Sequence, residues 1–321
     1  MVVHDPVRVL ALAGGVGGAK LASGFAELLG ERLTVVVNTG DDFEHLGFQI
    51  SPDLDTVMYT LAGIANPESG WGIAGETWHF MSQIERLGGP AWFRLGDRDL
   101  ATHAIRTERL RRGDSLTAVT SDLCHTLGVR ARVLPMTDDR VRTTVHTAGG
   151  SLPFQDYFVR LQCNVVVSGF SFVGAATARC NAELSLNDAN VPDAVVICPS
   201  NPYVSIAPIL ALPGLKQAIK DCGAPVIAVS PIIAGAAVKG PAAKMMRELG
   251  AAPSAQSVAE HYHDLIDAIV IDDSDSESAG AIEALGLAAR TTPTLMRTQA
   301  DRVRLAQECL DLAEALRASG R

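Results

Sequence analysis

The sequence predicts an α/β fold: a Rossmann-like, doubly wound and mostly parallel sheet with a helical and antiparallel insertion. Short runs of β-branched residues alternate with helical patterns, which is typical of βαβ units and a parallel sheet. Loops rich in glycine, aspartate or proline follow several of these runs, at the positions where open α/β sheets bind ligands. We therefore expect residues 1–321 to form a single domain, in which residues 70–167 are an insertion that covers one side of the site.

The core strands are predicted from apolar runs at residues 7–13, 33–38, 194–198, 225–230 and 268–271. A helix ending at Leu29 follows the first strand, a second helix opens at Ser51 and Pro52, and the last helix spans about Gln299–Ala318. Ser51 is expected to cap its helix, with Pro52 at the first position. Residues 70–128 have a mostly helical pattern, and residues 130–167 contain short alternating segments that favour antiparallel strands.

The composition excludes several classes of function. Hydrophobic residues make up 47% of the chain, which is enough for the large core of a globular enzyme. The formal net charge is −9, so neither nucleic acid nor an anionic membrane is an expected partner. Aromatic residues, at 5%, also argue against a surface that stacks single-stranded bases. An acidic protein that handles phosphates must gather positive charge locally or use metal ions.

The sequence also predicts a soluble, cytoplasmic protein. The six cysteines form no CxxC pair and mostly neighbour apolar residues, so we expect buried, reduced thiols. The N-terminal segment leads directly into the first strand and is unlike a secretory signal. The most apolar stretch is shorter than a membrane span and is broken by Pro231.

The first loop, AGGVGGAK, joins a strand to a helix and ends at Lys20. Its glycines Gly14, Gly15 and Gly17 would let backbone N–H groups approach an anion at the helix N-terminus. The spacing is neither GxGxxG nor that of a Walker A loop. The alternative is a tight turn between strand and helix with no ligand.

The segment NTGDDFEHLGFQISPDLDT carries four aspartates directly after the second strand and in the next helix. Magnesium needs only one or two carboxylates plus substrate phosphates, so this cluster predicts a Mg²⁺ site. Asp41 and Asp53 are the preferred metal ligands, because they come from separate elements that can converge. The alternative is that acids in a first helical turn merely favour the helix dipole. Asp53 and Asp55, two positions apart, do not share a helix face.

Two further loops after predicted strands point to the same edge of the sheet. In CPSNP, Ser200 or Asn201 can cap a helix that Pro202 opens. In SPIIAGAAVKGP, Lys239 could place a cation on a phosphate, or could be a solvated lysine. A third segment, WFRLGDRDLATH, offers Arg94, Arg98 and His103 for substrate contact, with an ion-paired loop as the equal alternative.

These motifs together resemble the 2-phospho-L-lactate transferase family of coenzyme F-420 biosynthesis. The resemblance is carried by LAGGVGGAK, NTGDD…ISPDLDTVMYTL, RLGDRDLATH, LPMTDD, FQDYFVR, PSNPYVSIAPIL and SPIIAGAAVKGPAAKMM, from residue 10 to about residue 246. ISPDLDT and the paired PSNP and KGP turns are specific, whereas the glycine loop alone is not. Lys20 departs from the arginine that we would expect in some relatives.

The resemblance implies transfer of a phospholactyl or phosphoenolpyruvyl group from a guanosine diphosphate conjugate to a deazaflavin. The acceptor would be the ribityl hydroxyl of 7,8-didemethyl-8-hydroxy-5-deazariboflavin, and GMP would leave. It further implies a homodimer, an acidic segment that holds Mg²⁺ and the acceptor hydroxyl, with Asp55 and Arg94 near the deazaflavin, and SNP and KGP turns at the nucleotide. Asp42 or Asp53 could accept the hydroxyl proton. The candidate substrate-binding residues are Gly14, Gly15, Gly17, Lys20, Thr39, Asp55, Thr56, Arg94, Ser200, Asn201, Pro202, Lys239 and Gly240.

Two other functions are weighed against this one. A non-catalytic regulator that binds nucleotide sugars could use the same core, but it would have little need for the acidic cluster. An NAD-dependent dehydrogenase is disfavoured, because the chain lacks both GxGxxG and the usual acidic residue that binds the ribose.

Overall fold

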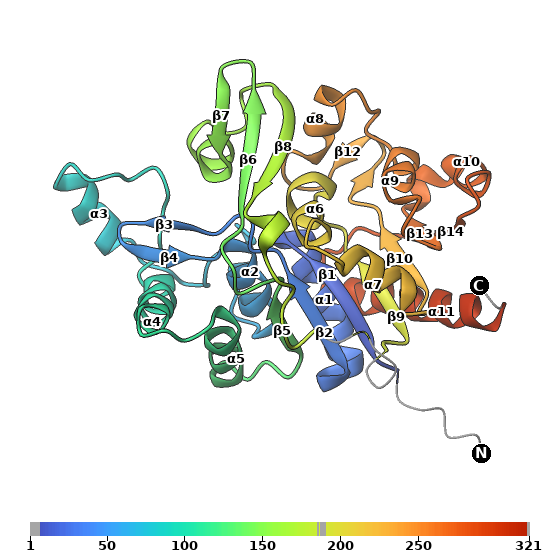
Figure 1. The fold of residues 1–321 in the computed structure, drawn as a ribbon, viewed down its shortest axis with the longest axis horizontal. Helices are drawn as coiled ribbons and strands as arrows, with labels where there is room; N and C mark the ends of the chain where they lie inside the picture. Colours follow the sequence, from blue (N-terminus) through green and yellow to red (C-terminus); the bar gives the residue numbers. More distant parts are fainter. Residues whose placement is uncertain (1–6, 185, 187–190, 320–321) are drawn as a thin grey trace.

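The computed structural model describes residues 7–184, 186 and 191–319. Seven strands form one sheet in the order β14-β13-β10-β9-β1-β2-β5, and every neighbouring pair is parallel (Figure 1). The chain moves outward in one direction from β1 to β2 and β5, and in the other from β9 to β14. The switch point therefore lies between β1 and β9, where doubly wound sheets bind ligands. The strands are β1 (Val9–Ala13), β2 (Leu33–Val37), β5 (Arg132–Pro135), β9 (Ala194–Ile197), β10 (Val226–Val229), β13 (Ala268–Ile271) and β14 (Ala288–Thr291).

Helices cover both faces of this sheet, and successive side chains of β1 point alternately to one face and the other. Val9, Ala11 and Ala13 pack in the core on one face, whereas Leu10 and Leu12 pack on the other. The first face is covered by α1 (Gly15–Leu29), α2 (Pro52–Leu61), α5 (Leu116–Thr126) and α11 (Gln299–Ala318). The second face is covered by α6 (Ala207–Leu210), α7 (Leu215–Asp221), α8 (Ala242–Glu248), α9 (Ala255–Tyr262) and α10 (Ala279–Glu283). The predicted doubly wound α/β fold is confirmed.

Smaller elements lie outside the main sheet, in three groups along the chain (Figure 1). Between β2 and β5 lie β3 (Phe43–His45), β4 (Phe48–Ile50), α3 (His79–Arg86) and α4 (Asp99–Arg111), together with α2 and α5. Between β5 and β9, an antiparallel sheet forms from β6 (Arg142–Thr147), β7 (Gly150–Pro153) and β8 (Val167–Val173). A short hairpin of β11 (Ile232–Ile233) and β12 (Ala236–Ala237) follows β10. The range 70–167 thus contains the expected helices and the antiparallel strands β6 and β7, but β8 begins at its last residue and runs to Val173, and β5 within the range belongs to the main sheet.

The strands and helices predicted for the core occur within one or two residues of their expected ends. One local prediction is wrong: the Ser51 side chain makes no capping hydrogen bond to α2. Its hydroxyl instead donates to Asp42 Oδ2 at 2.8 Å, so the buried carboxylate orients this side chain. Among the described residues, no helix has both the length and the apolarity needed to cross a membrane.

Candidate active site at the switch point

The glycine loop lies against two other segments of the protein at the carboxyl end of β1. A Cβ on Gly14 would lie 2.6 Å from Asp53 Oδ2 and 2.7 Å from Ser205 Cβ. A Cβ on Gly17 would overlap the backbone oxygen of Pro199. Glycine is therefore required here for close approach of the first turn of α2 and of the turn after β9. The Gly14 N–H donates to Ser200 Oγ at 3.2 Å, which joins the glycine loop to the SNP turn.

Asn38, the first residue after β2, is a fully buried connection between these segments. Its Nδ2 donates to Asp53 Oδ2 at 2.9 Å and to the Val204 carbonyl at 3.3 Å. Its Oδ1 accepts from the Gly40 N–H at 2.8 Å. One side chain thus holds the acidic loop, the first turn of α2 and the turn after β9 in fixed relation.

Three carboxylates at this edge are almost entirely buried: Asp41, Asp42 and Asp53. Burial raises the pKa of Asp41 well above its usual range, and the neighbouring charge of Asp53 raises it further. Burial also raises the pKa of Asp53 to about 6, against the hydrogen bonds from Asn38 and the Gly15 backbone. Asp41 and Asp53, from two separate elements, therefore lie close enough for their charges to interact.

Asp42 is as buried as Asp41 and Asp53 but has different neighbours. Burial raises its pKa to about 7, although the Arg142 charge and the Ser51 hydroxyl lower it. The Oδ1 atoms of both Asp41 and Asp42 are buried without a hydrogen-bond partner among the described residues. Unsatisfied buried carboxylate oxygens are costly, so a cation or a donated proton is the natural complement to these two atoms. Carboxylate oxygens also suit a hard cation such as Mg²⁺.

Asp55 lies in the same helical turn as Asp53 but faces another part of the protein. Both of its oxygens accept hydrogen bonds from the guanidinium of Arg106 on α4, from NH1 at 3.0 Å and from NH2. Arg106 is 1% exposed, and although burial alone would lower its pKa, Asp55 raises it above the ordinary value. The structure thus places the Asp55 carboxylate in a buried ion pair.

The ion pair continues into a network that reaches the start of α4. Arg106 NH1 lies 3.3 Å from His103 Nδ1, His103 Nε2 lies 3.3 Å from Asp99 Oδ2, and Tyr59 donates to Asp99 Oδ1 at 2.6 Å. Asp55, Asp99 and His103 offer ligand atoms within 4.8 Å of one another, so this group could hold a metal ion. Arg106 already supplies a positive charge to Asp55, which makes this group a poorer cation site than Asp41 and Asp53.

The SNP turn continues directly into η4 (Pro202–Ile206), a single π-helical turn. The Asn201 side chain caps it by accepting from the Tyr203 N–H at 3.0 Å, and Pro202 occupies its first position. π-Turns occur often at functional sites. Here the turn brings Ser205 against Gly14 and directs the Val204 carbonyl toward Asn38.

Lys239 and Gly240 follow the β11–β12 hairpin and are exposed. Lys239 Nζ donates to the Ser69 carbonyl, in the loop between α2 and α3. Lys20, one turn into α1, donates to the Met296 carbonyl at 3.0 Å. The charge of Lys239 adds to burial and to the charge of Arg302 in lowering the pKa of Lys20, so the two predicted phosphate-binding lysines lie near each other.

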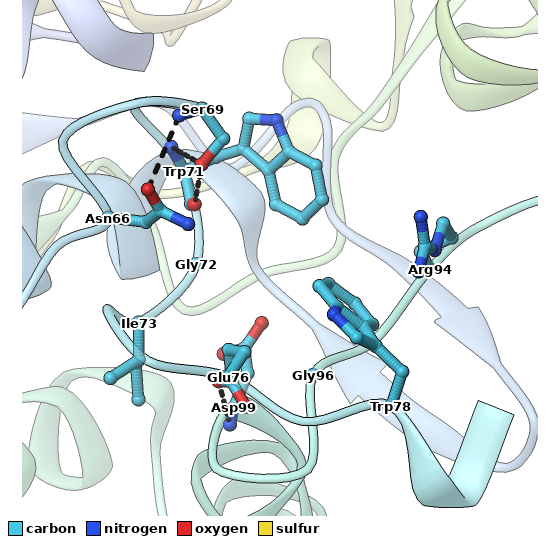
Figure 2. Close-up of a pocket in the computed structure, with 10 residues that line it drawn as sticks. All are labelled: Asn66, Ser69, Trp71, Gly72, Ile73, Glu76, Trp78, Arg94, Gly96 and Asp99. Carbon is cyan, nitrogen blue, oxygen red and sulfur yellow. Dashed lines mark hydrogen bonds between the residues drawn. The ribbon is translucent and has the colours of Figure 1, made fainter.

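Arg94 borders a cavity of about 110 Å³ formed by the segments before α4 (Figure 2). Its guanidinium lies over the Trp78 ring, 4.2 Å from the ring centroid. Figure 2 shows the Trp71 and Trp78 rings bordering the same space as Glu76. Two indole rings, one cation and one carboxylate suit a planar aromatic ligand with polar edges.

The structure brings Gly14, Gly15, Gly17, Asp41, Asp42, Asp53 and the SNP turn together, with Lys20 and Lys239 beside them. Thr39 and Thr56 are buried in the same region, whereas Asp55 faces Arg106. Sequence reasoning missed Asn38, Arg106, Arg142 and Ser205. Only Asn38 carried a local signal, because it is a polar residue directly after an apolar strand.

Comparison with known proteins, by family model and by sequence, points to one family of transferases. The family model described as 2-phospho-L-lactate transferase CofD matches residues 9–302. The phosphoenolpyruvate transferase of Kitasatospora aureofaciens is 43% identical over 319 residues, which cover 97% of this chain and 99% of the relative. The protein of that name from Streptomyces coelicolor is 42% identical, covering 97% and 99% of the two chains. That from Mycobacterium tuberculosis is 38% identical, covering 90% and 94%.

Among solved structures, a Bacillus halodurans protein of the UPF0052 family has the same fold. It superposes with a TM-score of 0.63 and covers 96% of this chain and 100% of its own. Its sequence is only 15% identical, so the similarity concerns the fold alone.

Proposed function

Because the chain belongs to the 2-phospho-L-lactate transferase CofD family, and is thus a transferase of coenzyme F-420 biosynthesis, we propose that it transfers a phosphoenolpyruvyl group. The donor is the guanosine diphosphate conjugate, and the acceptor is the ribityl hydroxyl of 7,8-didemethyl-8-hydroxy-5-deazariboflavin. The enolpyruvyl donor is preferred over the lactyl one because the similar full-length relatives are phosphoenolpyruvate transferases. Membership of an enzyme family also removes the basis for a purely regulatory role.

The observation that carries this proposal is the burial of Asp41, Asp42 and Asp53 at one edge of the sheet, with Asp53 against the glycine loop and its charge acting on Asp41. Asp41 and Asp53 would hold Mg²⁺, since Asp41 Oδ1 has no partner in the described part of the chain and the carboxylate donor set fits a hard cation. When bound, Mg²⁺ would supply positive charge to the diphosphate. Phosphoryl-type transfer depends mainly on such positioning and charge neutralisation.

The remaining chemistry belongs to the protein's own side chains. The acceptor hydroxyl oxygen forms a bond to the phosphorus that carries the enolpyruvyl group, and the bond from that phosphorus to the GMP oxygen breaks. Asp42 Oδ1 takes the hydroxyl proton. Asp42 is favoured over Asp53 because its Oδ1 has no partner among the described residues, whereas Asp53 is engaged by Asn38 and Gly15. A pKa of about 7 suits a base that works near neutral pH.

We place the deazaflavin ring at the opening of the cavity bordered by Trp71 and Trp78, with Arg94 at its edge. In this assignment Arg94 contacts the deazaflavin acceptor, whereas Asp55 belongs to the buried ion pair with Arg106. It also agrees with a single domain in which residues 70–167 cover the acceptor side. The SNP and KGP turns would then lie at the guanosine diphosphate part of the donor.

The direct test is incubation of the protein with Mg²⁺, the deazaflavin and each donor in turn, with products identified by mass. The expected product carries enolpyruvyl phosphate on the deazaflavin, together with one equivalent of GMP. Absence of product with every donor, from a folded protein in Mg²⁺, would overturn the proposal. Assembly as a homodimer stays a prediction, which light scattering after size-exclusion chromatography can check.

A further inference from the structure

Three basic side chains from distant parts of the chain gather on one side of α1. Lys20 belongs to α1, Lys239 follows the β11–β12 hairpin, and Arg302 lies in the first turn of α11. Arg302 belongs to none of the motifs discussed above.

The contacts of α11 place Arg302 beside Lys20. Lys20 Nζ donates to the Met296 carbonyl at 3.0 Å, just before α11 begins. One turn further along α1, Ser23 Oγ donates to Gln299 Oε1 at 3.1 Å, and Arg302 NH1 donates to the same oxygen at 3.3 Å. The start of α11 is thereby fixed across the Lys20–Ser23 segment of α1.

Lys239 approaches the same face of α1 through the loop at Ser69 and Gly70. Its Nζ donates to the Ser69 carbonyl, and a Cβ on Gly70 would lie 2.9 Å from that Nζ and 3.0 Å from Val16 Cγ1. Val16 and Lys20 are four positions apart, so they share one helix face. Lys239 therefore lies on the Lys20 side of α1.

The charge of this group is not compensated within the described part of the chain. None of the three side chains forms an ion pair with a carboxylate there. Arg302 Nε is also buried without a hydrogen-bond partner. Burial lowers the pKa of Lys20, and the charges of Arg302 and Lys239 lower it further. Lys20 and Arg302 are half-buried and Lys239 is exposed beside them, and like charges gathered in this way are unfavourable unless an anion joins them.

We propose that Lys20, Lys239 and Arg302 form a binding site for an anionic group of the donor, which makes Arg302 a donor-binding residue. This inference rests on the proposed function and extends its site. Gly15, which contacts Asp53, and Lys20 are five residues apart on α1, or about 7.5 Å along the axis. A diphosphate conjugate can span that distance. The group bound is a phosphate or the donor's carboxylate, since both offer charged oxygens to a guanidinium.

Calorimetric titration of the full chain with GDP, GMP and the enolpyruvyl conjugate tests the site. Arg302→Gln should weaken GDP binding about tenfold, the value of one lost charge-assisted hydrogen bond, and Arg302→Lys should weaken it less. A loss of GDP affinity identifies the phosphate as the bound group. A loss of affinity for the conjugate alone identifies the donor's carboxylate as the bound group. Unchanged affinity for GDP and for the conjugate would overturn the inference.

Arg317→Gln is the matched control, since Arg317 lies on the same helix and pairs with Asp193 at 2.7 Å. It should leave every affinity unchanged, and melting temperatures confirm that each variant is folded. The wild-type transferase assay separates the two proposals. If GDP binding depends on Arg302 but no transfer occurs, the proposed function fails and the anion site stands. If transfer occurs and Arg302→Gln changes neither affinity nor donor KM, only the anion site fails.

Discussion

At the scale of single residues, Asp42 is the group whose chemistry is tested most directly. Asp42→Asn removes the proton acceptor but keeps the shape and the Ser51 contact. Loss of a general base should lower kcat by about 10²–10⁴-fold with little change in donor KM. Steady-state kinetics measures both, and Glu44→Gln, an exposed change two residues away, is the control. A kcat within twofold of the wild type would assign the proton to another group.

A second prediction at this scale concerns Arg106 and the free energy of unfolding. Arg106→Met leaves the Asp55 carboxylate buried without its guanidinium partner, at a cost of about 3–5 kcal/mol. The double variant Arg106→Met with Asp55→Leu removes both charges and should recover most of that loss, because no buried ion remains. Urea unfolding measures each free energy. Arg109→Met, on the same helix but at an exposed ion pair, should have little effect. A double variant no more stable than Arg106→Met would contradict this reasoning.

Arg94 should act in acceptor binding rather than in the chemical step. Arg94→Ala removes the cation over Trp78, and an interaction lost equally in ground and transition states raises KM while kcat stays nearly constant. We expect a rise in the deazaflavin KM of about threefold to tenfold, from the loss of an exposed cation–π contact. Kinetics with the deazaflavin varied gives the answer. A fall in kcat at unchanged KM would move Arg94 to the donor side.

At the scale of elements, the contact between α1 and the turn after β9 depends on Gly17. Alanine there would overlap the Pro199 carbonyl, and neither backbone can move away without displacing the SNP turn. Gly17→Ala should therefore destabilise the protein by about 1–3 kcal/mol and weaken GDP binding. The control is Gly280→Ala in α10, where a Cβ meets nothing within 4 Å and alanine favours the helix. Thermal unfolding and GDP titration compare the two, and equal effects would show that the contact is unimportant.

The helix α2 separates two functions that are adjacent in sequence. Asp53 and Asp55 are two positions apart and face different partners, as their spacing predicts. Asp53 faces the glycine loop and Asn38, whereas Asp55 faces Arg106 on α4. The first turn of α2 thus places Asp53 at the site, and Asp55 in the same turn connects α2 to α4 through Arg106.

At the scale of the whole molecule, the buried acids link stability to pH and to magnesium. A carboxyl group whose folded pKa is raised binds more protons in the native chain than in the unfolded chain. For Asp42 this holds between the unfolded pKa, about 4, and the folded pKa of about 7. Asp53, with a pKa of about 6, adds to the effect. The metal-free protein should therefore lose stability as pH rises from about 4 to 7.

Magnesium should reverse this loss, because it binds the ionised carboxylates of the folded state. We expect Mg²⁺ to raise the melting temperature by at least about 3 °C more at pH 8 than at pH 5, where Asp53 and Asp42 are largely protonated. Melting curves in chelator and in Mg²⁺ at both pH values measure the difference. Asp41→Asn with Asp53→Asn should abolish it. An equal shift at both pH values would contradict metal binding at these acids.

The sequence by itself determined the fold class, most strands of the sheet and the loops that form the site. These features depend on local patterns, such as the apolar run of β13 or the glycines after β1, which need no knowledge of distant residues. The strands β5 and β14 were not predicted from the sequence. β14 is a partly exposed edge strand without an apolar run, and the short RVLP run of β5 lies within a stretch expected to form antiparallel strands.

Only the tertiary structure decided which charged groups meet. Arg106 lies 51 residues from Asp55, and Arg302 approaches Lys20 from the last helix. Such pairs depend on how whole helices pack, and packing is set by the combined shape of two buried faces rather than by any local spacing. The sequence supplied four aspartates as candidate ligands. The packing of α2 against α1 and α4 left two of them, Asp41 and Asp53, together beside the glycine loop and placed Asp55 against an arginine.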